Sequence, residues 1–232
     1  MVKVVYAFAK AYIKEFLHKE SYNSLEIIPH MLTNYFRYYK PFAVILLVSL
    51  CLAGIMWLQQ WNWTYPIFGL GLLGMVLHIV DRYLWKYPPF SWMFTIEDFS
   101  GTYTGKQECH IIKDGEFKIV LIDVAMIIVQ TGSSISVHAF YKKHDERSSN
   151  SYSELCIISK TEDKMHYKIL HQYTNEGSTH LDRHQGTSTI KVIKDGQDYF
   201  LEGNYYTNRT PFPTQGKFLR LQRQTMETIH QS

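Results

Sequence analysis

Two short segments place aromatic and cationic side chains where an anionic ring compound could bind. In FSGTYTG, Tyr103 stands between two glycines on one face of a strand. In FLEGNYYTNR, Tyr205, Thr207 and Arg209 share one face, because strand side chains alternate with a period of two. Tyrosine rings offer flat faces for stacking, and the planar guanidinium of arginine matches phosphate oxygens. These residue types therefore suit a ligand that combines purine rings with phosphates.

A third segment, TQGKF, begins the last predicted strand with the hydroxyl of Thr214 and a glycine. Glycine inside a strand often marks the close approach of a bulky group. The glycines and aromatics can equally be packing partners that close a tight barrel, and both interpretations stay open. His184 could donate a hydrogen bond to an anionic ligand. The predicted ligand-binding residues are Tyr103, His184, Tyr205, Thr207, Arg209 and Thr214.

The sequence contains none of the common catalytic motifs. It has no GxSxG, HExxH or P-loop pattern, and its three cysteines lie in no nucleophile or CxxC motif. Four histidines between residues 166 and 184 have no acidic or cysteine ligands at matching intervals, so no metal site is predicted. A GxGxxG at residues 69–74 lies inside an apolar run, not after a strand, and predicts no dinucleotide site. We therefore expect a protein that is not an enzyme and uses no cofactor.

Two apolar runs near the N-terminus are predicted to form a membrane hairpin. Pro41–Leu58 contains no charge and would rise about 27 Å as a helix, which nearly crosses a hydrocarbon core of about 30 Å. Trp63–Val80 is equally long, and only residues 59–62 separate the two. Lysine and arginine flank the outer ends and are missing from the turn. The positive-inside rule therefore predicts a multi-pass protein with both termini in the cytoplasm.

The hairpin with its flanks covers residues 41–86, and a proline-containing linker covers residues 87–98. Before the hairpin, residues 1–40 are predicted to form an amphipathic helical segment with lysines around an apolar face. This segment would lie in the membrane interface, or pack on the cytoplasmic domain or on a neighbouring copy. Both alternatives stay open.

From about residue 99 the pattern changes to strands. Alternating residues rich in Thr, Tyr, Val and Ile are interrupted at short intervals by turn residues. About eight antiparallel strands in residues 99–224 favour a closed barrel, which leaves no exposed edge and can enclose one small ligand. Residues 116–131 are predicted to form either one bent strand or two strands. Residues 225–232 are predicted to form a tail. The predicted strands cover about 99–110, 116–131, 134–142, 151–160, 164–174, 186–194, 198–208 and 214–223.

The overall composition excludes several classes of protein. A net charge of +3 and a pI near 8.6 are too mild for a duplex-binding protein, so no DNA or RNA partner is expected. The mean hydropathy of -0.19 averages an apolar hairpin with a polar remainder. The cysteine pattern predicts no disulfide framework, in keeping with a reducing cytoplasm.

The combination of parts resembles a known family. Two membrane helices followed by FSGTYTG, HYKILHQYTN, HQGT, LEGNYYTNR and TQGKFLRLQR are similar to the two-transmembrane β-barrel effectors of bacterial cyclic-oligonucleotide anti-phage signalling systems (CBASS). The resemblance covers about residues 40–223. It implies that the cytoplasmic barrel binds a cyclic dinucleotide made by a partner nucleotidyltransferase. Binding would drive homo-oligomerisation of the transmembrane segments, disrupt the bacterial inner membrane and cause abortive infection.

Two other classes of protein remain open. A membrane-anchored, lipocalin-like barrel that binds a lipid or a small apolar ligand predicts a charge-free cavity. A scaffold that docks a protein on its outer surface predicts a filled interior. Arg209, on the same strand face as Tyr205, favours a polar anion over an apolar ligand, and the scaffold stays open.

Overall fold

The computed structural model describes residues 34–59, 66–113, 116–143, 146–177, 182–210 and 212–225. The chain divides into two compact units, Met1–Arg37 and Tyr38–Ser232. In the described part of the first unit, Arg37 donates a hydrogen bond to Asn34 Oδ1 at 2.6 Å. Most of the amphipathic segment predicted for residues 1–40, and nearly all of the predicted tail, lie outside the described residues.

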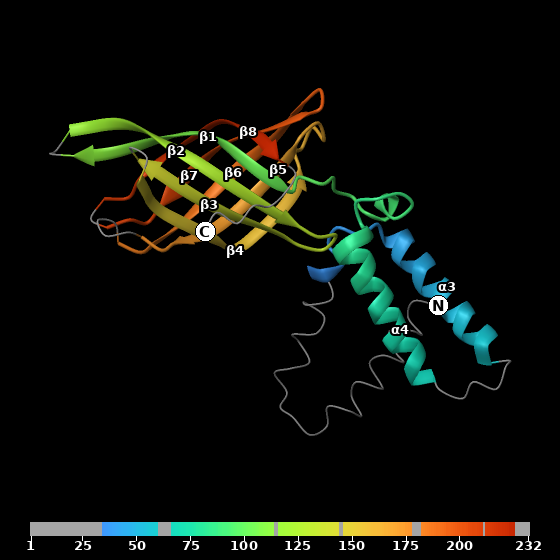
Figure 1. Cartoon of the computed structure of the whole chain (residues 1–232). Helices are drawn as coiled ribbons and strands as arrows, with labels where there is room; N and C mark the ends of the chain where they lie inside the picture. The colour runs from blue at the N-terminus through green and yellow to red at the C-terminus, as the bar shows by residue number, and fades with distance from the viewer. Residues whose placement is uncertain are drawn as a thin grey trace, which may run out of the picture. The chain divides into compact units, whose positions relative to one another are not determined.

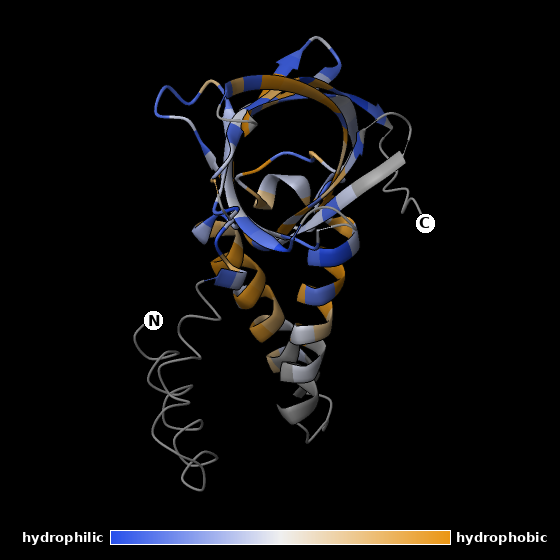
Figure 2. Ribbon diagram, turned by 90° about the vertical axis from the view of Figure 1, so that its left-hand side faces the viewer, coloured by the Kyte–Doolittle hydropathy of each residue, from blue (hydrophilic) through white to orange (hydrophobic). Residues whose placement is uncertain are grey.

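Two helices occupy the region of the predicted hairpin. They are α3 (Pro41–Gln59) and α4 (Pro66–Ile79), shown in Figure 1. Helix α3 carries no charge, and Phe42, Leu50 and Met56 on it are more than half exposed. Figure 2 shows its hydrophobic colouring. Among the described residues, however, no helix combines the length and hydropathy needed to cross a membrane. The helices are confirmed, and their insertion into a membrane stays a prediction.

The predicted closed barrel of eight antiparallel strands is confirmed. Each strand pairs with its neighbours in the sequence, and β1 pairs with β8 to close the barrel (Figure 1). The stretch from Glu116 to Gln130 forms one strand, not two. Between β6 and β7, Gly196 has a φ of +63°, the left-handed conformation that its tight turn requires. The strands are β1 (Gly101–Lys113), β2 (Glu116–Gln130), β3 (Ile135–Lys143), β4 (Glu146–Lys160), β5 (Tyr167–Asn175), β6 (His184–Asp195), β7 (Asp198–Thr207) and β8 (Gln215–Thr225).

The segment just before α3 is attached to the segment that leads into the barrel. The Lys40 amide donates to Met93 O at 2.7 Å, and the Thr95 amide donates to Tyr38 O at 2.8 Å. The predicted linker contains a 3₁₀ turn at Ser91–Met93, and a π-helix at Val80–Leu84 follows α4. The segment that precedes α3 in the sequence and the segment that follows α4 therefore meet at one end of the barrel, which we call the helix-side end.

Side chains complete the barrel wall where β3 and β4 separate. The β3–β4 ladder runs from Lys143↔Glu146 to His138↔Tyr152. Beyond it, Ser153 Oγ bonds both the amide and the carbonyl of Val137, at 2.7 and 2.9 Å. Further along β4, the Ile158 amide donates to the Tyr38 hydroxyl at 3.0 Å. Tyr38 is only 4% exposed and belongs to the barrel core.

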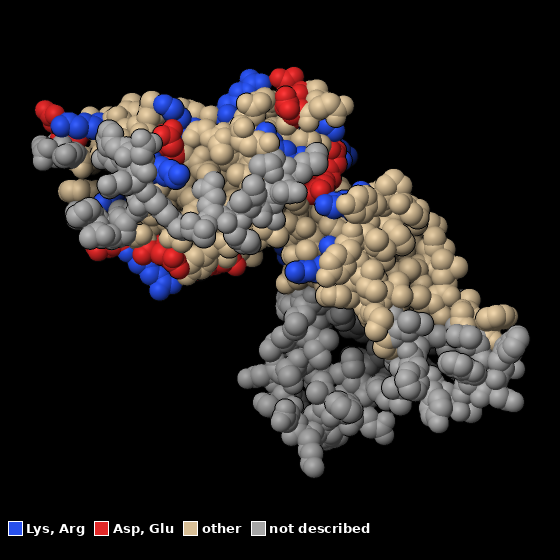
Figure 3. Space-filling model, in the orientation of Figure 1, with Lys and Arg blue, Asp and Glu red and all other residues tan. Residues whose placement is uncertain are grey.

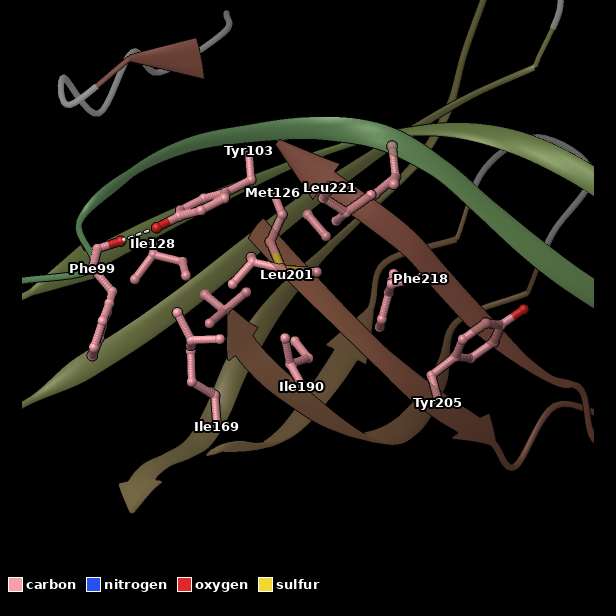
Figure 4. Close-up of a cluster of buried hydrophobic side chains, with 14 of the residues drawn as sticks. Phe99, Tyr103, Met126, Ile128, Ile169, Ile190, Leu201, Tyr205, Phe218 and Leu221 are labelled. Carbon is pink, nitrogen blue, oxygen red and sulfur yellow. Dashed lines mark hydrogen bonds between the residues drawn. The ribbon is translucent and has the colours of Figure 1, made fainter. Parts of the chain in front are cut away.

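The helix-side half of the barrel interior is filled with apolar side chains. Figure 4 shows this cluster, in which the Tyr103 hydroxyl donates to Phe99 O at 3.0 Å and Tyr205 lies at the far end. Charged residues lie on the barrel surface, whereas the visible surface of the helix pair is largely uncharged (Figure 3). The most deeply buried members of the cluster are Phe99, Tyr103, Met126, Ile128, Val137, Ala139, Ile169, Ile190, Leu201 and Leu221, none more than 1% exposed.

Candidate functional site

The other half of the barrel interior contains a cavity of about 130 Å³, in which polar side chains lie among tyrosine rings and two isoleucines. Its wall includes residues of β1, β5 and β7 and of the loop that joins β7 to β8. A neighbouring hollow of about 360 Å³ shares His184 and Arg209 with it, so these two residues stand at the mouth. The cavity is lined by Gln107, Cys109, Ile111, Ile122, Tyr141, Ser149, Tyr173, Asn175, His184, Tyr205, Thr207, Arg209 and Thr214.

The structure brings five of the six predicted binding residues together and leaves one apart. Tyr103 is fully buried in the apolar half, where it bonds Phe99 and where the Arg223 guanidinium lies 5.9 Å from its ring centroid. Alternation correctly predicts that Tyr103 points inward, but it does not give the height of a residue along the barrel axis. The five residues that line the cavity are His184, Tyr205, Thr207, Arg209 and Thr214.

Two cavity tyrosines lie against glycines on the neighbouring strands. Tyr205 pairs with Gly216 and Tyr173 pairs with Gly186. A Cβ atom on Gly216 would lie 2.7 Å from the Tyr205 ring, and one on Gly186 would lie 2.5 Å from the Tyr173 ring. The glycines therefore make room for the rings, as the packing interpretation predicts, while both rings still line the cavity.

The tyrosine hydroxyls in the cavity stay protonated at neutral pH. Burial raises the pKa of Tyr141 to about 12, and it raises the pKa of Tyr173 and Tyr205 further. Burial also raises the pKa of the Cys109 thiol, which opposes formation of a nucleophilic thiolate. These groups can donate hydrogen bonds and pack against rings, but they are not activated for catalysis.

The loop that carries Arg209 is fixed at both ends. The Thr207 amide donates to Thr214 O at 2.8 Å, and the two threonine hydroxyl oxygens are 2.7 Å apart. Asn208 joins the loop to β6: its amide donates to Gln185 O at 3.0 Å, and its Oδ1 accepts from the Gln185 amide at 2.8 Å. Thr207 and Thr214 thus hold the loop in shape, in addition to lining the cavity.

The two residues at the mouth are available to a ligand. Arg209 is partly buried and lines both hollows, and among the described residues no carboxylate forms an ion pair with it. His184 Nδ1 donates to Asp182 O at 2.9 Å, since a carbonyl oxygen can only accept, and Nε2 is left for another partner. A guanidinium at the mouth of a cavity, with no carboxylate partner among the described residues, can bind an anion.

The sequence contained signals for several cavity residues that were not predicted. Gln107 and Cys109 continue the inward alternation that begins at Tyr103, and Tyr173 and Asn175 follow the same rule in HYKILHQYTN. Asn208 follows the last residue of β7, a position where asparagine often closes a turn. In the part of the chain that the structure describes, no three His, Cys, Asp or Glu side chains gather as metal ligands.

A family model described as Cap15, cyclic dinucleotide receptor domain, matches residues 94–223. This span includes every residue of the cavity and almost the whole barrel. The chain belongs to the Cap15 family. The predicted resemblance to CBASS effectors that sense cyclic dinucleotides is confirmed. Cap15 is a receptor family and not a known enzyme family. No curated protein and no solved structure matches the chain.

Proposed function

We propose that the cavity of this Cap15 receptor binds the cyclic dinucleotide, with the phosphates at Arg209. The observation that carries this proposal is the Arg209 guanidinium, which forms no ion pair with any described residue and lies at the mouth of a cavity lined by tyrosine rings and hydroxyls. A cyclic dinucleotide carries two phosphodiester charges and two flat bases, so it matches both features.

The two rival interpretations fit this cavity less well. A lipid or another apolar ligand would leave the Arg209 guanidinium without an anionic partner in a partly desolvated site, which is unfavourable. A scaffold needs no cavity at all. The guanidinium of Arg209 therefore supports an anionic ligand.

The proposal extends to the helices. The helix pair would insert into the bacterial inner membrane with both termini cytoplasmic, and a partner nucleotidyltransferase would supply the ligand. The exposed apolar surface of α3 supports contact with lipid. Apart from the adjoining residues and backbone of α4 itself, no described atom lies within 4 Å of a Cβ placed on Gly71 or Gly74, so this surface of α4 has space for another helix.

Binding would drive homo-oligomerisation, membrane disruption and abortive infection. On the outer barrel surface, Phe117, Ile119 and Leu121 are each more than half exposed along β2, next to Ile112 of β1. Such an apolar strip is suited to contact with a second copy. To shift the ratio of active to resting protein from 1:99 to 99:1, the ligand must bind the active state more tightly by about 5.5 kcal/mol. Charge-assisted hydrogen bonds to Arg209, each worth about 1.5–3 kcal/mol, can contribute a large part.

The test is calorimetric binding of the full chain in detergent to cyclic di-AMP, cyclic di-GMP, cyclic GMP–AMP and cyclic UMP–AMP. We expect tight binding of at least one compound. Arg209→Ala should weaken it by roughly ten- to a hundredfold, because one charge-assisted contact is lost. Arg220, which pairs with Asp195 on the outside, provides a matched control, and Arg220→Ala should bind as the wild type does.

Two results would contradict the proposal. If the folded wild-type chain binds none of the four compounds, the proposal that this cavity binds a cyclic dinucleotide is wrong. If Arg209→Ala binds the nucleotide with wild-type affinity, the proposed function still holds, but a cation other than Arg209 binds the phosphates.

A further inference from the structure

Gln107 presents a buried hydrogen-bond acceptor that no described residue uses. The residue is 6% exposed, and its Nε2 donates to Cys109 Sγ at 3.3 Å. The Tyr205 hydroxyl is also a hydrogen-bonding neighbour of this amide. Within the described residues, however, no donor reaches Gln107 Oε1. A buried carbonyl oxygen without a donor is unfavourable, so a native protein rarely keeps one unless another molecule supplies the donor.

Gln107 lies on the floor of the cavity. It is on the inward face of β1, where it pairs with Phe218 of β8, a member of the apolar cluster. Arg209, by contrast, lies two residues beyond the end of β7, at the mouth. A ligand that bonds both residues must therefore extend from the mouth to the floor.

The chemistry of the two ends differs. A phosphodiester has no proton to donate, so it cannot satisfy Gln107 Oε1, whereas nucleobase N–H groups can. The cavity of about 130 Å³ is also close to the roughly 150 Å³ that is known to hold one benzene ring. It has room for about one six-membered ring, such as a pyrimidine or the six-membered ring of a purine, and not for a whole cyclic dinucleotide.

We propose that Gln107 is a specificity-determining residue: one base of the ligand enters the barrel and donates a hydrogen bond to Gln107 Oε1, while the phosphates stay at the mouth with Arg209. This inference rests on the proposed function and adds the pose and the base-reading residue. It requires a base that directs an amino or imino group inward. The ordinary alternative is a buried water that satisfies the same oxygen.

The experiment compares the full chain with two variants. Gln107→Leu keeps nearly the same shape and removes the acceptor. Because it removes an unsatisfied buried polar group, it should melt at the same temperature as the wild type or higher. Gln172→Leu makes the same change at an exposed position of β5 and serves as the matched control.

The probes are the compound that binds the wild type most tightly and its donor-deleted analogues, measured by calorimetry. In these analogues, adenine is replaced by purine, guanine by hypoxanthine or 1-methylguanine, and uracil by 3-methyluracil, one base at a time. In the wild type and in Gln172→Leu, one analogue should bind roughly tenfold more weakly than its parent. Gln107→Leu should bind the parent more weakly than the wild type does and should lose the preference for the parent over that analogue.

Three results would overturn the inference. If Gln107→Leu binds the parent as tightly as the wild type, the oxygen is satisfied by water. A second result is that Gln107→Leu binds the parent more weakly, while the wild type binds all analogues with the same affinity as the parent. The donor is then a ribose hydroxyl and not a base. If no compound binds the wild type, the proposed function fails together with this inference.

Discussion

His171 lies inside the barrel, between Ile169 of the apolar half and Tyr173 of the cavity. It is 4% exposed, its Nδ1 is 3.2 Å from Ser188 Oγ, and its ring centroid is 5.1 Å from that of Tyr173. Burial, and to a smaller extent His138, lower the pKa of His171 from 6.5 to about 4. The folded barrel therefore contains this imidazole in its neutral form at neutral pH.

This shift predicts a loss of stability in acid. Between pH 6.5 and about 4 the unfolded chain binds a proton at His171 that the folded chain excludes, so the free energy of unfolding falls as the pH falls through this window. The loss should reach about 3 kcal/mol at most. Urea unfolding of the wild type and of His171→Asn at pH 7, 5.5 and 4.5 measures it. The variant should lose less stability, and parallel losses would show that His171 is not responsible.

At the residue scale, the sequence predicted the face of a side chain better than its height. The period of two correctly placed Tyr103, Tyr205 and Thr207 inside the barrel. It could not show that Tyr103 packs near Phe99 while Gln107, four residues later, reaches the cavity. Height along the axis depends on how far neighbouring strands are staggered, and that stagger is set by pairing across the whole barrel.

At the scale of elements, most strands were recognisable because apolar and polar residues alternate between turn signals. Strand β4 was the exception: it begins at Glu146, whereas the sequence indicated a start near residue 151. Residues 146–150 are all polar and carry no alternation, so nothing local marks them as a strand. They are held by pairing with β3, a contact between segments that a local pattern does not reveal.

Tyr38 was not predicted to belong to the barrel, because it precedes α3 in the sequence. Its hydroxyl accepts from the Ile158 amide at the gap between β3 and β4. Tyr38→Phe leaves that buried amide without an acceptor, which should lower the free energy of unfolding by about 1–3 kcal/mol. Urea unfolding measures the loss. Tyr206→Phe, on an exposed face of β7, is the control and should change stability by less than about 0.5 kcal/mol.

Equal stability of the two variants would mean that water replaces the Tyr38 hydroxyl. The contact also affects how the receptor should be studied. A fragment limited to the matched residues 94–223 would lack Tyr38, so a fragment of this kind should be less stable than the full chain.

At the scale of the molecule, Asp81 connects the end of α4 to the barrel. Its Oδ2 accepts from Ser133 Oγ at 3.0 Å, its Oδ1 accepts from Tyr39 at 3.3 Å, and its backbone oxygen accepts from the Gly132 amide at 3.0 Å. The residue lies in the π-helix Val80–Leu84, an irregularity often found at functional sites. It links the β2–β3 turn to both helices.

If ligand binding acts on the helices through the barrel, weakening this connection should separate the two events. We expect Asp81→Ala to bind the nucleotide within about twofold of the wild type, since the cavity lies in the opposite half of the barrel, and to lose growth arrest when the ligand is produced in cells. Calorimetry and growth curves test the two parts. Asp195→Ala, in the exposed β6–β7 turn, is the control and should keep both. Normal growth arrest in Asp81→Ala would show that the signal does not depend on this contact.

The packed apolar half has a kinetic consequence. In the described barrel it closes the inner end of the cavity, so a bound molecule must leave by the route through which it entered, past His184 and Arg209. The described part of the anchored loop that carries Arg209 forms part of this exit, so its hydrogen bonds would influence the rate of release. The residence time of the nucleotide, and with it the duration of the signal after synthesis stops, would be determined by a handful of loop hydrogen bonds and not by equilibrium affinity alone.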